Sequence, residues 1–155
     1  MKVLVICSGN ICRSPMAAEY LRARAAQSGL AHLVVDSAGT LGIEGRPASA
    51  EAVAVMAEAG YDLSAHRSRG LAYTDLRSSD LVIGMSSGHL EHLAESYPDG
   101  RDERLLLRAF EKSPQPSRSA PDLEDPITRP IEFYRETFER IRRCVDHLTI
   151  HLKHG

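Results

Sequence analysis

The sequence has no tryptophan, three phenylalanines and five tyrosines, so a pocket in this protein has few aromatic rings to draw on. Three cysteines are too few, and odd in number, for a disulfide framework, and they indicate a reduced, cytoplasmic protein. No apolar run approaches the length of a membrane span, and no apolar leader with a cleavage site follows Met1 and Lys2. We therefore expect neither secretion nor a membrane partner.

An excess of positive charge is also missing, because 19 lysines and arginines face 21 aspartates and glutamates, for a net charge of −2. A domain that binds nucleic acid ordinarily carries a basic patch, so we expect no nucleic-acid partner. The 155 residues are 43% hydrophobic and 26% charged, which suits one globular domain, residues 1–155, with a single sizeable core. We expect this domain to be a monomer.

Apolar runs alternate with helical patterns along the chain. The runs predict strands at 2–6, 33–35, 81–85 and 105–107, and helices are predicted at 15–28, 48–59 and 90–97. This alternation indicates an α/β fold, with a central four-stranded parallel sheet and helices on both faces. A long C-terminal helix follows, whose buried face is predicted to contain Ile131, Tyr134, Phe138, Ile141, Val145, Leu148 and Leu152.

The longest irregular stretch spans residues 112–130 and contains five prolines, several serines and an acidic cluster. A loop of this length inside a compact domain is usually functional or disordered. The cluster consists of Asp122, Glu124 and Asp125, each of which is a candidate acid for catalysis.

A cysteine and an arginine separated by five residues lie between the first strand and the first helix, in the segment Cys7-Ser8-Gly9-Asn10-Ile11-Cys12-Arg13-Ser14. Gly9 permits a tight turn, the helix that follows contributes its positive end, and Arg13 offers a planar fork to two phosphate oxygens. These groups, with the Ser14 hydroxyl, would also stabilise a thiolate at Cys7. The sequence thus predicts a phosphate-binding loop after strand 1 with a nucleophile at its base, although Cys7 could instead be a buried cysteine at a strand end.

Residues 5–15 resemble the signature of the low-molecular-weight protein tyrosine phosphatases, and the similarity covers nearly the whole chain. Asp125-Pro126 resembles the general-acid motif of that family, at the expected distance before the last helix. The resemblance implies a cysteinyl-phosphate mechanism with Cys7 as nucleophile, Arg13 as phosphate clamp and Asp125 as acid and base, without metal or cofactor. It also implies a hydrogen-bond network that supports the loop, formed by Asn10, Ser14, Ser37 and His66.

The resemblance further implies a phosphorylated protein or peptide as substrate and inorganic phosphate as product. The family surrounds its substrate with aromatic rings, whereas this chain has Ile43 and Ile127 near such positions, and Ser8 stands where a larger apolar residue is common in the family. A close branch of the family removes phosphate from arginine and has a threonine at the position of Ile11. Ile11 favours phosphotyrosine, and phosphoarginine is the alternative. The predicted substrate-binding residues are Ser8, Gly9, Asn10, Ile11, Cys12, Ser14, Ile43 and Ile127.

Two further functions fit the sequence less well. Arsenate reduction on a related fold needs a relay of additional cysteines, and none lies between Cys12 and Cys144. A phosphopeptide-binding module without catalysis would be expected to lose Cys7 or Asp125.

The remaining cysteines and histidines have modest predicted roles. Cys12 either traps an oxidised Cys7 as a disulfide, as the resemblance implies, or packs within the loop. Cys144 is predicted to lie in the core. His147 and His151 have the spacing of metal ligands, but nothing nearby completes a site, so we predict a solvated helix face.

Overall fold

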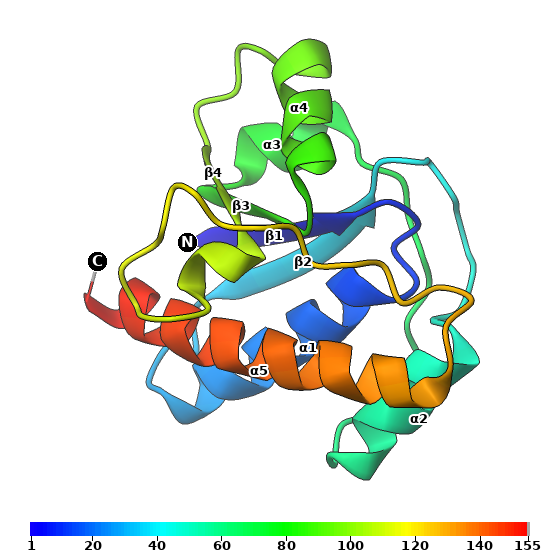
Figure 1. Cartoon of the computed structure of the whole chain (residues 1–155). Helices are drawn as coiled ribbons and strands as arrows, with labels where there is room; N and C mark the ends of the chain where they lie inside the picture. The colour runs from blue at the N-terminus through cyan, green and yellow to red at the C-terminus, as the bar shows by residue number, and fades with distance from the viewer. Residues whose placement is uncertain (155) are drawn as a thin grey trace.

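The computed structural model describes residues 1–154, and a four-stranded sheet lies at its centre (Figure 1). The strands are β1 (Lys2–Cys7), β2 (Val34–Gly39), β3 (Leu81–Gly84) and β4 (Glu103–Leu106). All three pairings are parallel, in the order β2-β1-β3-β4. The predicted α/β fold with a parallel sheet is confirmed, and β1 delivers Cys7 to the carboxyl edge, where open α/β sheets bind ligands.

Helices cover both faces of the sheet, as predicted. The helices α1 (Arg13–Gln27), α2 (Ala50–Glu58) and α5 (Ile131–His154) lie on one side of it in Figure 1, and α3 (Tyr73–Ser78) and α4 (Ser87–Ser96) lie on the other. A short 3₁₀ helix, η1 (Leu107–Phe110), follows β4 and packs against α5. None of the helices within residues 1–154 has both the length and the hydropathy to cross a membrane.

The side chains of β1 alternate between two apolar clusters, as expected for a strand buried on both faces. Val3 and Val5 belong to the larger cluster, which includes residues of α1, α2 and α5. Leu4 and Ile6 belong to the smaller one, together with Leu93 of α4. The predicted face of α5 lies in the larger cluster, where Ile131 and Leu152 are half-buried at its ends.

Replacing Ile141 with alanine should lower the free energy of unfolding by about 2–5 kcal/mol, because the side chain is fully buried and its loss leaves a cavity. Ile150 on the same helix is 45% exposed, so Ile150→Ala is the matched control and should change stability by less than about 1 kcal/mol. Urea unfolding measures both. Equal losses would mean that α5 is not packed as described.

Several elements differ from the sequence prediction: η1 was not predicted, β4 covers Glu103–Leu106 where 105–107 was predicted, and α3 and β2 differ as follows. The helix α3 was missed because it has only six residues and buries a single apolar side chain, Leu76, which is too little to show a helical period. The strand β2 begins one residue later than predicted and continues to Gly39, where a loop was predicted. Turn-forming residues such as Asp36 and Ser37 are held in the strand by parallel pairing with β1, in which Cys7 lies opposite Gly39.

The stretch 112–130 is irregular, as predicted, but it is fixed to the sheet and to α4. The Leu123 N–H donates to the Met85 carbonyl at 2.8 Å. Asp122 connects the start of α4 to η1. Its carboxylate accepts the Ser87 N–H at 2.8 Å, and its backbone carbonyl accepts from Nη1 of Arg108 at 2.8 Å. These contacts hold the acidic cluster beside the carboxyl edge of the sheet.

The prediction of a solvated face for His147 and His151 is wrong. His147 Nδ1 lies 2.6 Å from the Phe110 carbonyl of η1, which can only accept, so this nitrogen donates. The His151 ring packs against the Phe110 ring at a centroid distance of 5.2 Å. Both histidines attach α5 to η1, and within residues 1–154 no cluster suited to a metal ion occurs.

Candidate active site

The Cys7 sulfur lies at the end of β1 and faces two hydrogen-bond donors. The Asn10 N–H is 3.3 Å from Sγ, and the Ser14 hydroxyl oxygen is 2.9 Å from it. Residues 8–12 loop around this sulfur before α1 begins at Arg13, so the positive end of the helix also faces the site. Two donors and the positive end of a helix thus surround the Cys7 sulfur.

The direction of the Ser14 proton follows from its neighbours. The Arg69 N–H donates to Asn10 Oδ1 at 3.1 Å, which identifies the amide nitrogen as the other branch of that side chain. That nitrogen donates to Ser14 Oγ at 2.8 Å and to Ser37 Oγ at 3.0 Å. Because Ser14 Oγ accepts from Asn10, its own proton is available for the Cys7 sulfur.

Asn10 has a left-handed backbone with a φ of 58°, a conformation that costs free energy in residues other than glycine. His66 stabilises it, since Nε2 lies 2.7 Å from the Asn10 carbonyl and must donate to it. Burial lowers the pKa of His66, so the ring is neutral near pH 7 and carries its proton on Nε2.

The loop is also supported from behind by backbone contacts with β2 and the residues after it. The Thr40 and Leu41 N–H groups donate to the Cys7 and Ser8 carbonyls, each at 3.0 Å. A Cβ at Gly39 would lie 2.6 Å from the Ser8 carbonyl oxygen, so only glycine permits this approach.

Arg13 connects the cysteine loop to the acidic segment. Its side chain is only 5% exposed; Nη1 donates to the Leu123 carbonyl at 2.9 Å, and Nη2 lies 3.4 Å from Asp125 Oδ2. Its buried Nε has no hydrogen-bond partner within residues 1–154. A buried guanidinium N–H without a partner is costly unless an anion accepts from it, which fits a bound phosphate.

A cavity of about 220 Å³ opens at the cysteine. Its wall is mainly aliphatic, and Leu41, which the sequence analysis did not identify, belongs to it. Leu41 is 67% exposed, which is unusual for a leucine, but sequence alone does not show that exposure. The other lining residues are Cys7, Ser8, Gly9, Ile11, Cys12, Arg13, Ile43, Asp125 and Ile127.

Of the predicted site residues, nine therefore line this cavity, and Asn10, Ser14, Ser37 and His66 form the hydrogen-bond network behind it. The rival acids lie elsewhere. Asp122 accepts from the Ser87 N–H at the start of α4, and Glu124 pairs with Arg129 at 2.9 Å. Among the three acids, Asp125 alone lines the cavity.

Cys12 packs rather than ionises. Its sulfur lies 3.5 Å from both the Ser49 and the Tyr134 hydroxyl oxygens, and burial raises the pKa of this thiol. Cys7, Cys12 and Cys144 are all free thiols in the structure. Packing of Cys12 is therefore visible, and the disulfide with Cys7 stays a prediction.

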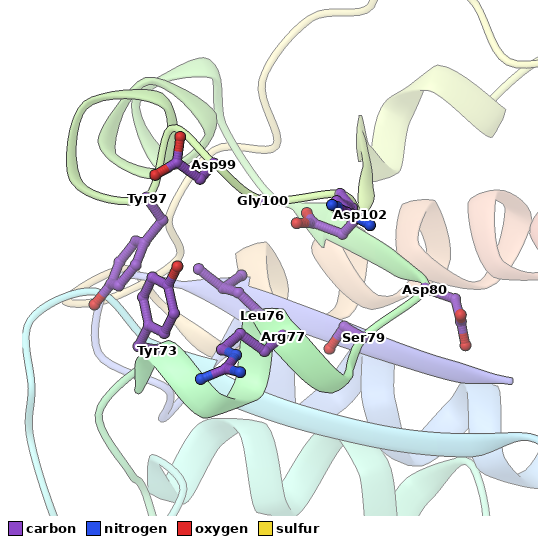
Figure 2. A pocket seen from close by; sticks show the side chains of 10 residues that line it. Tyr73, Leu76, Arg77, Ser79, Asp80, Tyr97, Asp99, Gly100 and Asp102 are labelled. Atoms are coloured by element: carbon purple, nitrogen blue, oxygen red, sulfur yellow. The ribbon is translucent and has the colours of Figure 1, made fainter.

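A larger cavity of about 390 Å³ lies elsewhere, between α3 and the segment that joins α4 to β4 (Figure 2). Tyr73 and Tyr97 lie side by side on one wall, with ring centroids 5.5 Å apart. Of its acids, Asp102 pairs with Arg104 at 2.8 Å and Asp80 accepts the Lys2 N–H at 2.8 Å. No cysteine or histidine lines this cavity, whereas Cys7 and Cys12 line the smaller one.

The geometry of the smaller cavity suits phosphoryl transfer. Its lining combines the Cys7 sulfur, which can attack phosphorus, the Arg13 guanidinium, which can neutralise a transferred group, and the Asp125 carboxylate.

Comparison with known proteins agrees with this chemistry. Residues 2–155 match the family described as low molecular weight phosphotyrosine protein phosphatase. A protein-arginine-phosphatase of Geobacillus stearothermophilus is 35% identical over 95% of this chain and 93% of its own. A low molecular weight protein-tyrosine-phosphatase of Streptomyces coelicolor is 38% identical over 90% of this chain and 86% of its own.

Solved structures of similar fold are also phosphatases. A low molecular weight protein tyrosine phosphatase from T. tengcongensis superposes with a TM-score of 0.85, at 38% identity over 96% of this chain and 97% of that one. The YwlE arginine phosphatase, in a mutant with a phosphorylated active-site serine, superposes with a TM-score of 0.90 at 29% identity, over 99% of this chain and 96% of that one.

Proposed function

The chain belongs to the low molecular weight phosphotyrosine protein phosphatase family, and on that premise we propose that it hydrolyses phosphotyrosine in proteins or peptides. The substrate is held in the cavity at Cys7, and residues 1–155 act as one catalytic domain. The observation that carries the proposal is the Cys7 sulfur, which faces two donors at the base of an aliphatic cavity whose mouth holds one acid.

In the first step, the Cys7 thiolate attacks phosphorus and an S–P bond forms. The bond between phosphorus and the phenolic oxygen breaks, and Asp125 gives its proton to that oxygen. Arg13 donates to the phosphoryl oxygens, for which its Nε is free. No metal is required because the guanidinium and the loop N–H groups neutralise the charge.

In the second step, water attacks the phosphorus of the cysteinyl phosphate. Asp125, now a carboxylate, accepts the proton of the water, the S–P bond breaks, and inorganic phosphate leaves with the thiolate restored. A thiolate nucleophile needs reducing conditions, which fits a cytoplasmic location, and the three described cysteines are free. We propose that the enzyme works as a monomer.

The choice of phosphotyrosine rests on Ile11. A Cβ at Gly9 would lie 3.5 Å from Ile11 Cγ1 and 3.9 Å from Ile43 Cδ1, so both isoleucines lie beside Gly9, and both line the cavity. Such a wall packs against a phenyl ring and offers no hydrogen bond to a guanidinium group. Phosphoarginine is the second candidate, and the absence of an aromatic ring among the lining residues is the observation that favours it.

A comparison of kcat/KM on phosphotyrosine and phosphoarginine peptides tests this choice. We expect the unmodified enzyme to prefer phosphotyrosine. Ile11→Thr should move the ratio of the two values toward phosphoarginine by about tenfold or more, since it removes apolar contact and adds a hydroxyl. Ile150→Thr on the exposed side of α5 is the control and should leave the ratio unchanged. A preference of the unmodified enzyme for phosphoarginine would overturn the choice.

A further inference from the structure

His89 joins the helical layer above the sheet to the cysteine loop. It lies in the first turn of α4, its side chain is 5% exposed, and its Nε2 is 3.0 Å from Ser8 Oγ. Ser8 follows the nucleophile directly and lines the cavity. The mechanism above assigns nothing to this buried histidine, although 81 residues separate it from Ser8 in the chain.

The geometry fixes which ring nitrogen carries the proton. The Ser86 N–H lies 3.1 Å from His89 Nδ1, and a backbone N–H can only donate. Nδ1 therefore accepts, and a neutral ring has its proton on Nε2. Burial, with a smaller effect of Arg13, lowers the pKa of His89 to about 4, so the ring is neutral near pH 7. His89 thus donates to Ser8, and Ser8 Oγ accepts.

The direction of the hydrogen bond from His89 determines what the Ser8 hydroxyl can do. A hydroxyl that accepts from a fixed donor keeps one proton of its own and must give it to another acceptor. Ser8 is the one hydroxyl among the lining residues, which otherwise combine an aliphatic wall with the two cysteines, Arg13 and Asp125. Asp125 is the one carboxylate among the lining residues, and the mechanism uses it as acid and base, so we assign the Ser8 proton to an oxygen atom of the bound substrate.

We propose that His89 is a positioning residue that holds the Ser8 hydroxyl as a hydrogen-bond donor to an oxygen of the phosphorylated substrate. Ser8 is then a specificity-determining residue of the cavity. Two hydrogen bonds follow one another, the first from His89 of α4 to Ser8 and the second from Ser8 to the substrate. This inference rests on the proposed function, since it deepens the account of the same site.

Two substitutions of His89 separate positioning from a structural role. In His89→Asn the amide oxygen of the new side chain can still accept from the Ser86 N–H, but that side chain is too short to reach Ser8. In His89→Gln the longer amide can donate to Ser8 and gives up the contact with Ser86. Positioning predicts that His89→Gln retains kcat/KM and that His89→Asn loses about threefold to tenfold, the effect of one hydrogen bond. The reverse order would overturn the proposal.

A double-mutant cycle with Ser8→Ala gives a second test that does not depend on the stability of one variant. Ser8→Ala alone should lower kcat/KM by about threefold to tenfold, and adding His89→Asn should lower it little further, because both remove the same bond. Additive losses, or no effect of Ser8→Ala, would contradict the proposal. Inhibition by inorganic phosphate identifies the acceptor: weaker inhibition of Ser8→Ala indicates a phosphoryl oxygen, and unchanged inhibition indicates the leaving group or peptide.

The ring tautomer provides a measurement that needs no activity. Nitrogen-15 NMR of the intact protein should show His89 with an unprotonated Nδ1 and a protonated Nε2 between pH 6 and pH 8. A protonated Nδ1 would overturn the proposal. If the protein hydrolysed no phosphomonoester while this tautomer was present, the proposed function would fail and the placement of the Ser8 proton would stand.

Discussion

Cys7→Ser is expected to lower kcat on a generic aryl phosphate by on the order of 10⁴-fold or more, the largest effect of any substitution in this protein. The donors around Sγ can hold a thiolate, but a serine hydroxyl at the same place stays protonated and is a weak nucleophile. The fold should persist, because the two side chains differ only in sulfur and oxygen. Turnover with p-nitrophenyl phosphate, together with circular dichroism, measures both.

Cys144→Ala is the matched control for this experiment. That thiol is fully buried on α5 and does not line the cavity, so its loss should leave kcat per folded molecule unchanged. Mass spectrometry of the quenched unmodified enzyme should find phosphate on Cys7. Undiminished turnover by Cys7→Ser would contradict the assignment of the nucleophile.

Asp125→Asn is expected to have the second-largest effect, and its size should depend on the leaving group. Phenyl phosphate, with a basic leaving oxygen, should lose about 10²-fold to 10³-fold in kcat, because general acid catalysis supplies that much. p-Nitrophenyl phosphate should lose less, since its leaving group departs with little need of a proton. Steady-state kinetics on the two substrates gives the comparison.

Glu124→Gln serves as the control for Asp125, since Glu124 is a neighbouring carboxylate that pairs with Arg129 outside the cavity. It should change kcat for both substrates by less than about twofold, as expected for an exposed ion pair. Equal losses on both substrates in Asp125→Asn would count against its role as the acid. A larger loss in Glu124→Gln would transfer that role to Glu124.

Sequence reasoning located the parts of the site that are close together in the chain. Cys7, Arg13 and Ser14 lie within one loop after an unmistakable apolar strand, so their proximity needs no tertiary information. Asp125, Ile43 and Ile127 were reached through resemblance to a family, and the structure brings all three to the same cavity. The parallel sheet followed from alternating strands and helices.

Other contributions are invisible in one sequence because they depend on long-range contacts. His89 reaches Ser8 only after α4 has folded over the sheet, and the Arg69 backbone reaches Asn10 across 59 residues. Leu41 gives no local sign that it lies on a cavity wall. The attachment of His147 to Phe110 depends on η1, a single turn that local propensity does not predict.

The close approach of Gly39 to the backbone of the cysteine loop affects how the substrate preference of this enzyme could change. The loop is fixed by backbone contacts with the chain after β2, so its shape owes little to the side chains that surround the substrate. The side chains of Leu41, Ile43 and Ile127 line the cavity and take no part in this backbone support. Mutations of these cavity-lining side chains can therefore change which substrate is bound, while the groups that act on the phosphate stay the same.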